Sequence, residues 1–294
     1  MSRGSYKKTS DSRGEGQMDT AAKRDTLGRR CRFTRTPLGK RLVLGPRDAV
    51  ILRWLYRYRY LRQDHLLALI RPRSEKRFVE RLGDLFHETG YLNRPALLAP
   101  HFDARSTPML YEISQSGVAY LDSHDALPPR TVTFSRRSPR AYNPQILHTM
   151  MIIDTLLAVE LATRQTPNQR FVPVDEILAR APASTRRAPN PLSIPVTVLP
   201  ERNHPVVRTR METHLIPDAL YGVEHRAGGE KRYRFFALEC ERTSPISRST
   251  AKASSRALKE ATYDALIRSG AFTQHWGIPN LALQFCSRSK LGPR

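Results

Sequence analysis

Apolar residues recur at helical spacing three times between residues 46 and 86, and this pattern predicts three helices. Pro46 can begin the first helix, because a proline at the first helical position has no intrahelical hydrogen bond to lose. The second helix is short, with Leu61, Leu66, Leu67 and Ile70 as its apolar residues. It ends at Arg71-Pro72, since the residue before a proline avoids the helical conformation. The third helix begins near Ser74 and ends at Gly90.

The third predicted helix has two faces of different character. Its apolar face is formed by Phe78, Leu82, Leu85 and Phe86. The opposite face is polar and mostly basic, and it is formed by Arg73, Lys76, Arg77 and Glu80. Such a face is either a contact surface for a polyanion or a face that is merely solvated.

A small β-structure follows the three helices. Residues 91–92 open an extended segment, and residues 95–98 and 109–113 predict a β-hairpin around a polar loop. Residues 114–121 predict a closing helix with Ser114 as its cap. This order is that of a winged helix-turn-helix, in which the third helix enters the major groove and the wing touches the DNA backbone. We therefore expect DNA contacts from basic residues of the third helix and the hairpin, namely Arg73, Lys76, Arg77, Arg94 and Arg105. The alternative is a winged helix that binds another protein.

A long helix is predicted from residue 145 to about residue 163. Asp154 lies in the middle of its apolar stripe, where an acid needs a partner or a cation. A buried, hydrogen-bonded structural aspartate is the simpler interpretation. The helix also carries His148 and Glu160, so we do not expect it to span a membrane.

Two apolar and aromatic stretches, residues 214–223 and 232–242, predict strands joined by a Gly228-Gly229 turn. Side chains alternate along a strand, so Glu239 and Glu241 share a face. If the strands pair as a hairpin, Asp218 joins these two glutamates. Grouped carboxylates repel one another unless a cation lies between them, and such a cluster suits Mg²⁺ or Mn²⁺. The alternative is that these acids at strand ends are only solvated.

The remaining pattern completes an α/β (α+β) arrangement. It predicts a short strand at 171–174, a helical turn at 175–178 and a proline-rich irregular stretch at 181–205 with an extended piece at 194–199. A basic helix at 249–269 and a final strand at 280–285 follow.

Charge and cysteine content narrow the class of protein. Lysine and arginine number 49 against 27 acids, a formal charge of +22, which favours a nucleic-acid partner. The three cysteines contain no Cys-X-X-Cys pair, which argues against a structural zinc site and fits a reducing compartment. The basic start precedes no apolar segment of a secretory signal, so we expect a soluble, cytoplasmic protein with no membrane partner.

These observations predict four regions. Residues 1–42 form a disordered basic tail, and residues 43–124 form the winged helix-turn-helix. Residues 125–144, rich in proline and arginine, form a linker. Residues 145–294 form a second domain around the predicted strands.

The second domain resembles the PD-(D/E)XK nuclease superfamily, which has a central mixed sheet. The resemblance lies in the order helix, Pro217-Asp218 strand, Glu239-Cys-Glu241 strand, helix and strand. It implies that Asp218 and Glu239 bind the metal and that Asp154 is the acid on the helix. The lysine expected two residues after Glu239 is replaced by Glu241, and Lys259 on the next helix takes its place.

From about residue 45 the whole chain resembles the replication-relaxation family. The matching pieces lie at residues 47–69, 110–117, 148–154, 216–219, 238–243 and 259–263. The family joins a winged helix to a nuclease-like domain and occurs with mobilisation or replication genes of plasmids and integrative elements.

Three functions follow as expectations. The first is a DNA-binding accessory protein of a mobile element, acting in replication, relaxation or mobilisation at an origin or a promoter. The second is a metal-dependent nickase or endonuclease with Asp218, Glu239, Glu241, Lys259 and Asp154 at its centre and Mg²⁺ or Mn²⁺ as its cofactor. The third is a non-catalytic scaffold that recruits a relaxase or a replication initiator. Double-stranded DNA is the expected partner, and a homodimer is a possible assembly.

Overall fold

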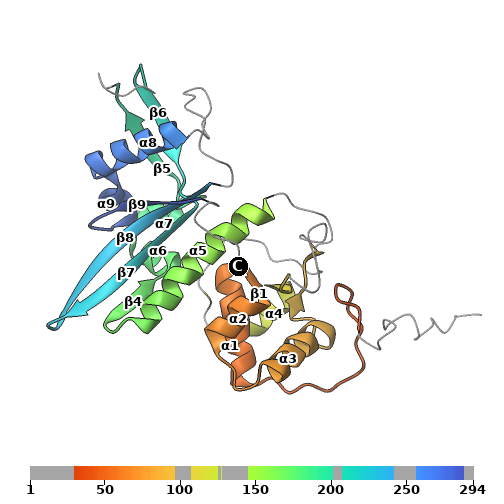
Figure 1. Ribbon diagram of the computed structural model, residues 1–294. Helices are drawn as coiled ribbons and strands as arrows, with labels where there is room; N and C mark the ends of the chain where they lie inside the picture. Colours follow the sequence, from red (N-terminus) through yellow and green to blue (C-terminus); the bar gives the residue numbers. More distant parts are fainter. Residues whose placement is uncertain are drawn as a thin grey trace, which may run out of the picture.

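The computed structural model has an α+β fold and describes residues 30–96, 107–124, 127, 145–200, 207–241 and 256–287 (Figure 1). The chain has two parts, and the long helix Ile146–Gln165 that begins the second part packs against the first. We call residues 46–122 the N-terminal part and residues 146–287 the C-terminal part.

The described residues of the N-terminal part form four helices and a small antiparallel sheet. Its elements are α1 (Pro46–Tyr58), β1 (Tyr60–Arg62), α2 (Gln63–Ile70), α3 (Glu75–His87), β2 (Leu92–Asn93), β3 (Leu110–Ile113) and α4 (Gln115–Asp122). The strand order is β1-β3-β2. The helices lie where the apolar spacing predicts them, and Ser114 caps α4 by accepting a hydrogen bond from Gly117 N–H at 3.1 Å.

Two expectations for this part are wrong. Leu61, expected in the second helix, belongs to β1, because Arg59 ends α1 with a φ of 65° and turns the chain into the sheet. β3 pairs with β1 and with β2 (Leu92–Asn93), so the described strand before the loop ends ahead of the expected piece 95–98, of which residues 97–98 lie outside the described residues. Pro95 cannot donate a hydrogen bond to a ladder, so the pairing ends before it. The polar loop with Arg105 lies outside the described residues.

The C-terminal part is built on a four-stranded mixed sheet of order β4-β7-β8-β9. Its elements are α5 (Ile146–Gln165), β4 (Gln169–Val172), α6 (Val174–Arg180), α7 (Ala183–Arg187), β5 (Ile194–Val198), β6 (Met211–Leu215), β7 (Ala219–Ala227), β8 (Glu230–Glu241), α8 (Arg256–Ser269), α9 (Ala271–Trp276) and β9 (Ala282–Ser287). The β7–β8 and β4–β7 pairs are antiparallel, and β8–β9 is parallel.

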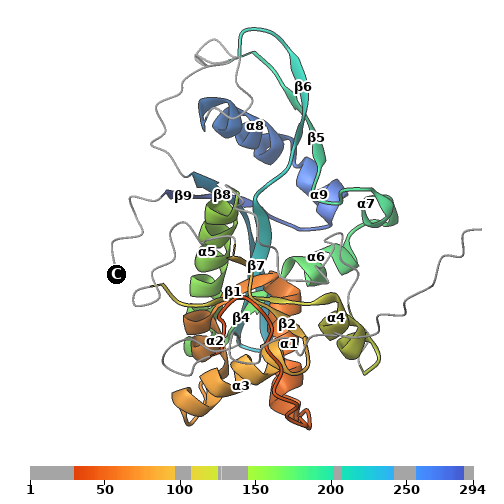
Figure 2. The same ribbon diagram turned by 90° about the vertical axis from the view of Figure 1, so that its right-hand side faces the viewer.

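The predicted hairpin forms, with Gly228 and Gly229 at positive φ in its turn. The predicted single strand 214–223 is divided, because residues 216–218 separate β6 from β7. β6 pairs with β5 in a separate sheet of two strands that extends beside α8 (Figure 2). The helices α7 and α9 were not expected.

Successive side chains of β8 point to opposite faces of the sheet and pack into two different apolar cores. Phe235 and Ala237 pack with residues of α8 and α9. Leu238 and Cys240 face the other way and pack with Met151 of α5. The mixed sheet therefore lies between α5 on one face and α8 with α9 on the other (Figures 1 and 2).

The opposite side of α5 packs on the N-terminal part. Its residues Ile146, Met150, Ile153 and Leu157 belong to the same apolar core as α1 to α4. By length and composition α5 could cross a membrane, with a mean hydropathy of 1.6. Its apolar residues contact protein on both sides.

Candidate functional site

The outer face of α3 is the first candidate site. The core side of α3 is fully buried, and the outer face carries Arg73, Lys76, Arg77 and Glu80, all of them exposed as expected. Ser74 begins the helix by accepting a hydrogen bond from Arg77 N–H at 3.4 Å. The guanidinium group of Arg77 has no ion-pair partner among the described residues, so its charge is available to a ligand.

Residues 30–43, which we call the N-terminal strap, run along the C-terminal half of α3 (Figure 1). Arg30 bridges Asp84 at 3.1 Å and Glu88 at 2.6 Å, and Lys40 reaches Asp84 at 3.0 Å. The expected disordered tail up to residue 42 is therefore wrong from residue 30 onward. The reason is that acids on α3 pair with basic residues of the strap. Residues 1–29 lie outside the described residues.

Arg35 anchors the middle of the strap to the end of α3. Its guanidinium group donates to the carbonyl oxygens of Phe86, Gly90 and Leu92 and to Asn93 Oδ1, at 2.6 to 3.1 Å. The last carbonyl groups of a helix have no intrahelical partner, so a cation is well placed there. This contact holds the strap independently of Asp84.

His87 lies beneath the strap and is buried. Its Nδ1 accepts a hydrogen bond from Thr36 N–H at 3.1 Å. Burial, together with the neighbouring guanidinium groups of Arg94 and Arg30, lowers the pKa of His87 to about 4. The ring is therefore neutral at physiological pH, and its Nδ1 can accept the hydrogen bond from the Thr36 N–H of the strap.

Arg94, expected to contact DNA, is not on the surface. It is 9% exposed, and its guanidinium carbon lies 4.6 Å from the centre of the Phe86 ring and 5.3 Å from that of Tyr111. Its Nη1 donates to the carbonyl oxygen of Arg32 in the strap at 3.3 Å. Stacking on two rings removes Arg94 from the exposed hairpin where the sequence predicted it.

The second candidate site is the end of the β7–β8 hairpin. The register pairs Ala219 with Leu238, so Asp218 lies just beyond β7, near the segment of β8 that holds Glu239. Asp218 Oδ2 accepts from Cys240 N–H at 2.8 Å and lies 3.2 Å from His148 Nε2 of α5. Burial raises the pKa of Asp218, but these hydrogen bonds outweigh burial and lower it. The pKa of His148 is raised by the same contact.

Glu239 faces α8 and is 2% exposed. Its Oε2 accepts from Lys259 Nζ at 2.5 Å and its Oε1 from Tyr263 OH at 2.7 Å. Burial lowers the pKa of Lys259, but the hydrogen bond to Glu239 raises it further, which keeps the amine charged. Lys259 thus reaches Glu239 from the next helix, as the sequence predicted. A cavity of about 250 Å³ between β6 and α8 borders this pair.

Glu241 and Asp154 are arranged differently from what was expected. Glu241 lies one alternation further along β8, with Oε2 4.0 Å from Arg256. Asp154 pairs with Arg62 at 2.8 Å and His65 at 2.9 Å in the N-terminal part, away from the carboxylates. Six residues separate His148 from Asp154 on α5, a rise of about 9 Å onto a different face. Asp154, the acid in the apolar stripe of the helix, therefore does have partners. They lie in the N-terminal part, so the resulting ion pairs connect the two parts of the chain.

The side chains at the hairpin end do not fit a divalent cation in this arrangement. Both oxygens of Glu239 and one of Asp218 already accept hydrogen bonds. Among the described residues there is no group of three or more His, Cys, Asp or Glu side chains placed to hold a metal ion.

Sequence reasoning missed two features of these sites. The strap was assigned to a tail, although the acids Asp84 and Glu88 at helical spacing on α3 offered a signal for a basic partner. His148 and Tyr263 were noted in the family pattern but not as site residues, and they are the side chains that hold Asp218 and Glu239.

Comparison with known proteins gives one family. A family model described as replication-relaxation matches residues 52–281, most of the described chain. No curated protein and no solved structure matches the chain.

Proposed function

Because the chain belongs to the replication-relaxation family, we propose that it is a DNA-binding accessory protein of a plasmid or integrative mobile element. It acts in replication, relaxation or mobilisation, at an origin or at a promoter, in the cytoplasm. Its N-terminal part works as a winged helix that presents α3 to the major groove of duplex DNA.

One observation carries this proposal. Arg73, Lys76 and Arg77 lie exposed together at the start of α3, while the opposite side of this helix is buried in the core. The helix is fixed by its core side and is followed by an antiparallel β2–β3 pair, as in a winged helix. The net charge of +22 adds long-range attraction to a polyanion.

The experiment is a titration of fluorescent duplex DNA at several salt concentrations. We expect the logarithm of the affinity to fall linearly with the logarithm of salt, because binding releases counterions. Replacing Arg73, Lys76 and Arg77 together with Ala should weaken binding and lower this slope by about three. The matched control replaces Arg186, Arg187 and Lys231, which are equally exposed and lie in the C-terminal part. If the wild type does not bind duplex DNA at low salt in this titration, the proposal is wrong.

Cleavage of DNA receives no support from the arrangement at the hairpin end. Glu239 is paired with Lys259 and Tyr263 of α8, and Asp218 is paired with His148 of α5 and with the Cys240 N–H. We therefore propose that the C-terminal part keeps a nuclease-like arrangement without using it for cleavage.

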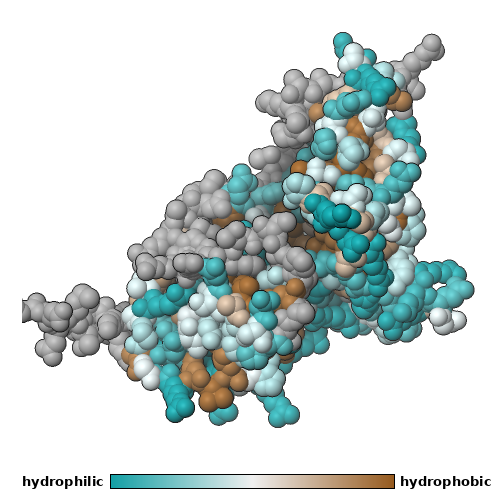
Figure 3. Space-filling view, turned by 180° about the vertical axis from the view of Figure 1, so that it is seen from behind, coloured by the Kyte–Doolittle hydropathy of each residue, from teal (hydrophilic) through white to brown (hydrophobic). Residues whose placement is uncertain are grey.

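The scaffold hypothesis would gain support from a large exposed apolar patch. On the face shown in Figure 3, apolar surface occurs in separate areas, the clearest at the lower end of the N-terminal part. Recovery of a relaxase or an initiator in a pull-down that survives nuclease treatment would favour the scaffold. Loss of these partners on treatment would favour tethering through DNA.

A further inference from the structure

We propose that the N-terminal strap and α3 together form a seat for a phosphate group, and that the duplex DNA of the proposed function supplies this phosphate. The source of the phosphate rests on the proposed function. The seat itself rests on the geometry of the strap.

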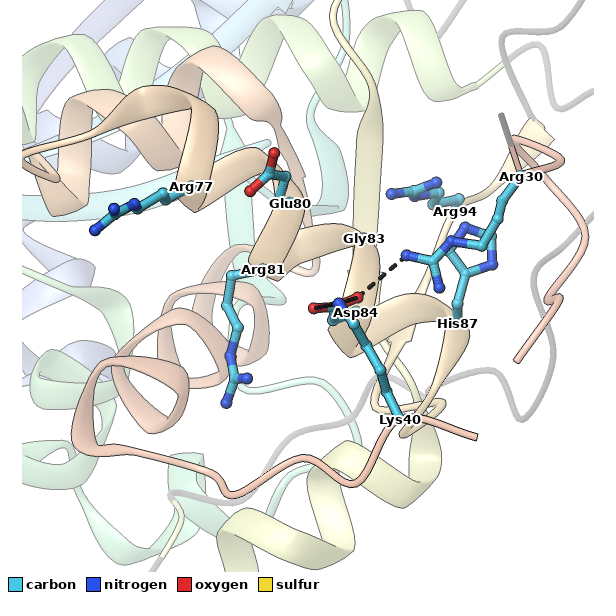
Figure 4. Close-up of a pocket in the computed structure, with 9 residues that line it drawn as sticks. All are labelled: Arg30, Lys40, Arg77, Glu80, Arg81, Gly83, Asp84, His87 and Arg94. Atoms are coloured by element: carbon cyan, nitrogen blue, oxygen red, sulfur yellow. Dashed lines mark hydrogen bonds and ion pairs between the residues drawn. The ribbon is translucent and has the colours of Figure 1, made fainter. Parts of the chain in front are cut away.

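A hollow of about 350 Å³ lies where the strap crosses α3 (Figure 4). Three segments contribute cations to it: the strap gives Arg30 and Lys40, α3 gives Arg77 and Arg81, and Arg94 follows β2. In Figure 4 Arg77 and Arg81 lie on one side of Asp84, and Arg30 and Arg94 lie on the other. The cations thus surround the hollow from segments that are far apart in the sequence.

The charge of the hollow favours an anion. Five cationic side chains and two carboxylates, Glu80 and Asp84, line it. With Glu88 and Asp48, which pair with Arg30 and Arg81 at 2.6 Å, the net charge is +1 because His87 is neutral. Asp84 already accepts from both Arg30 and Lys40. A phosphate oxygen can accept charge-assisted hydrogen bonds from the N–H groups of Arg30 and Lys40 that do not already bond to a carboxylate, and from the guanidinium group of Arg77.

The floor of the hollow has no side chain. Gly83 lies there, and a Cβ at this position would come within 3.5 Å of Arg94 Nη2 and 3.8 Å of Arg30 Nη2. Two guanidinium groups therefore face the same piece of bare helix backbone. Glycine costs about 1 kcal/mol in a helix relative to alanine, and here it leaves room between the cations.

The strap adds to DNA contact and does not block it. Residues 30–43 hold five basic residues and no acid. Without the strap, the outer face of the second half of α3 would present Glu80, Asp84 and Glu88, a row of acids that repels a polyanion. Arg30 and Lys40 neutralise this row and add positive charge beside Arg77.

The experiment measures duplex binding by two variants with opposite charge effects. Lys40→Gln should weaken binding about tenfold and lower the salt slope by about one. Asp84→Asn should tighten binding, because it removes the internal anion that competes with phosphate, while Arg35 still holds the strap. Lys231→Gln in the C-terminal part is the matched control and should change nothing. Weaker binding by both Lys40→Gln and Asp84→Asn would mean that the strap only loosens, which overturns the seat.

A second arm distinguishes the source of the phosphate. Isothermal titration with inorganic phosphate should show binding that Lys40→Gln reduces. If Lys40→Gln reduces only inorganic phosphate binding and leaves duplex affinity unchanged, the DNA source is overturned. If it reduces neither, the seat is overturned. If the wild type binds no duplex DNA, the proposed function fails, and the inorganic phosphate arm alone decides the seat.

Discussion

Single residues show how far a pairing can be read from a sequence. Asp218 and Glu239 could be placed near each other because a two-glycine turn fixes the register of one hairpin. The partner of Asp154 could not be predicted, because Arg62 lies 92 residues away and belongs to the other part of the chain. The apolar stripe showed that Asp154 needs a partner, but only the packing of α5 on α2 decides which one.

The pKa of His87 makes stability depend on pH. The unfolded ring gains its proton near pH 6.5 and the folded ring near pH 4, so the unfolded state binds more protons between these values. Folding stability should therefore be full above pH 6.5 and fall by up to ~3 kcal/mol as pH drops to 4. Urea unfolding at pH 7, 5.5 and 4 measures this loss.

His87→Asn is the matched control for this effect. Asn Oδ1 can accept the hydrogen bond from Thr36 N–H in place of Nδ1 and does not titrate. The variant should lose distinctly less stability than the wild type between pH 6.5 and 4. Parallel pH profiles for the two proteins would show that His87 does not cause the dependence.

At the scale of elements, long segments could be predicted and short ones could not. α1, α3 and α5 carry apolar residues over three turns or more, so their spacing is informative. β1 and β2 have three and two residues, too few for a period to appear. Their existence depends on pairing with β3. β5 lies within the piece 194–199 that the sequence predicted as extended, but its pairing with β6 could not be predicted.

α5 joins the two parts of the chain through a second acid, Glu160, which is buried. Glu160 is 4% exposed and accepts from Tyr58, Arg57 and Arg164, while Asp154 is about a quarter exposed. Glu160→Gln should destabilise the protein by about 2–3 kcal/mol, because it removes the buried anion to which the buried Tyr58 hydroxyl and the partly exposed Arg57 and Arg164 donate.

Asp154→Asn serves as the comparison on the same helix. It breaks a more exposed pair and should cost about 1 kcal/mol or less. Denaturant melts of both variants measure the difference. An equal loss for the two substitutions would contradict the ranking by burial.

At the scale of the whole molecule, the C-terminal part can be tested directly for cleavage of DNA. We expect the purified protein to leave supercoiled plasmid intact with Mg²⁺ or Mn²⁺, because Lys259 and Tyr263 already bind the oxygens of Glu239. An agarose gel of wild type beside an Asp218→Ala, Glu239→Ala double variant gives the measurement. Nicking by the wild type that disappears in the double variant, with duplex binding retained, would contradict this expectation.

The parallel pairing of β8 with β9 sets an order of assembly. β7 and β8 are joined by a two-residue turn and can pair locally, whereas β9 pairs with β8 only after α8 and α9 have brought the chain back. Closing such a long loop costs conformational entropy before the β8–β9 hydrogen bonds can form and offset this cost. We therefore expect this edge of the sheet to form late during refolding. Trp276 on α9 is fully buried and donates to the carbonyl oxygen of Pro191. Its fluorescence therefore reports the late step, while Trp54 on α1 reports the folding of the N-terminal part.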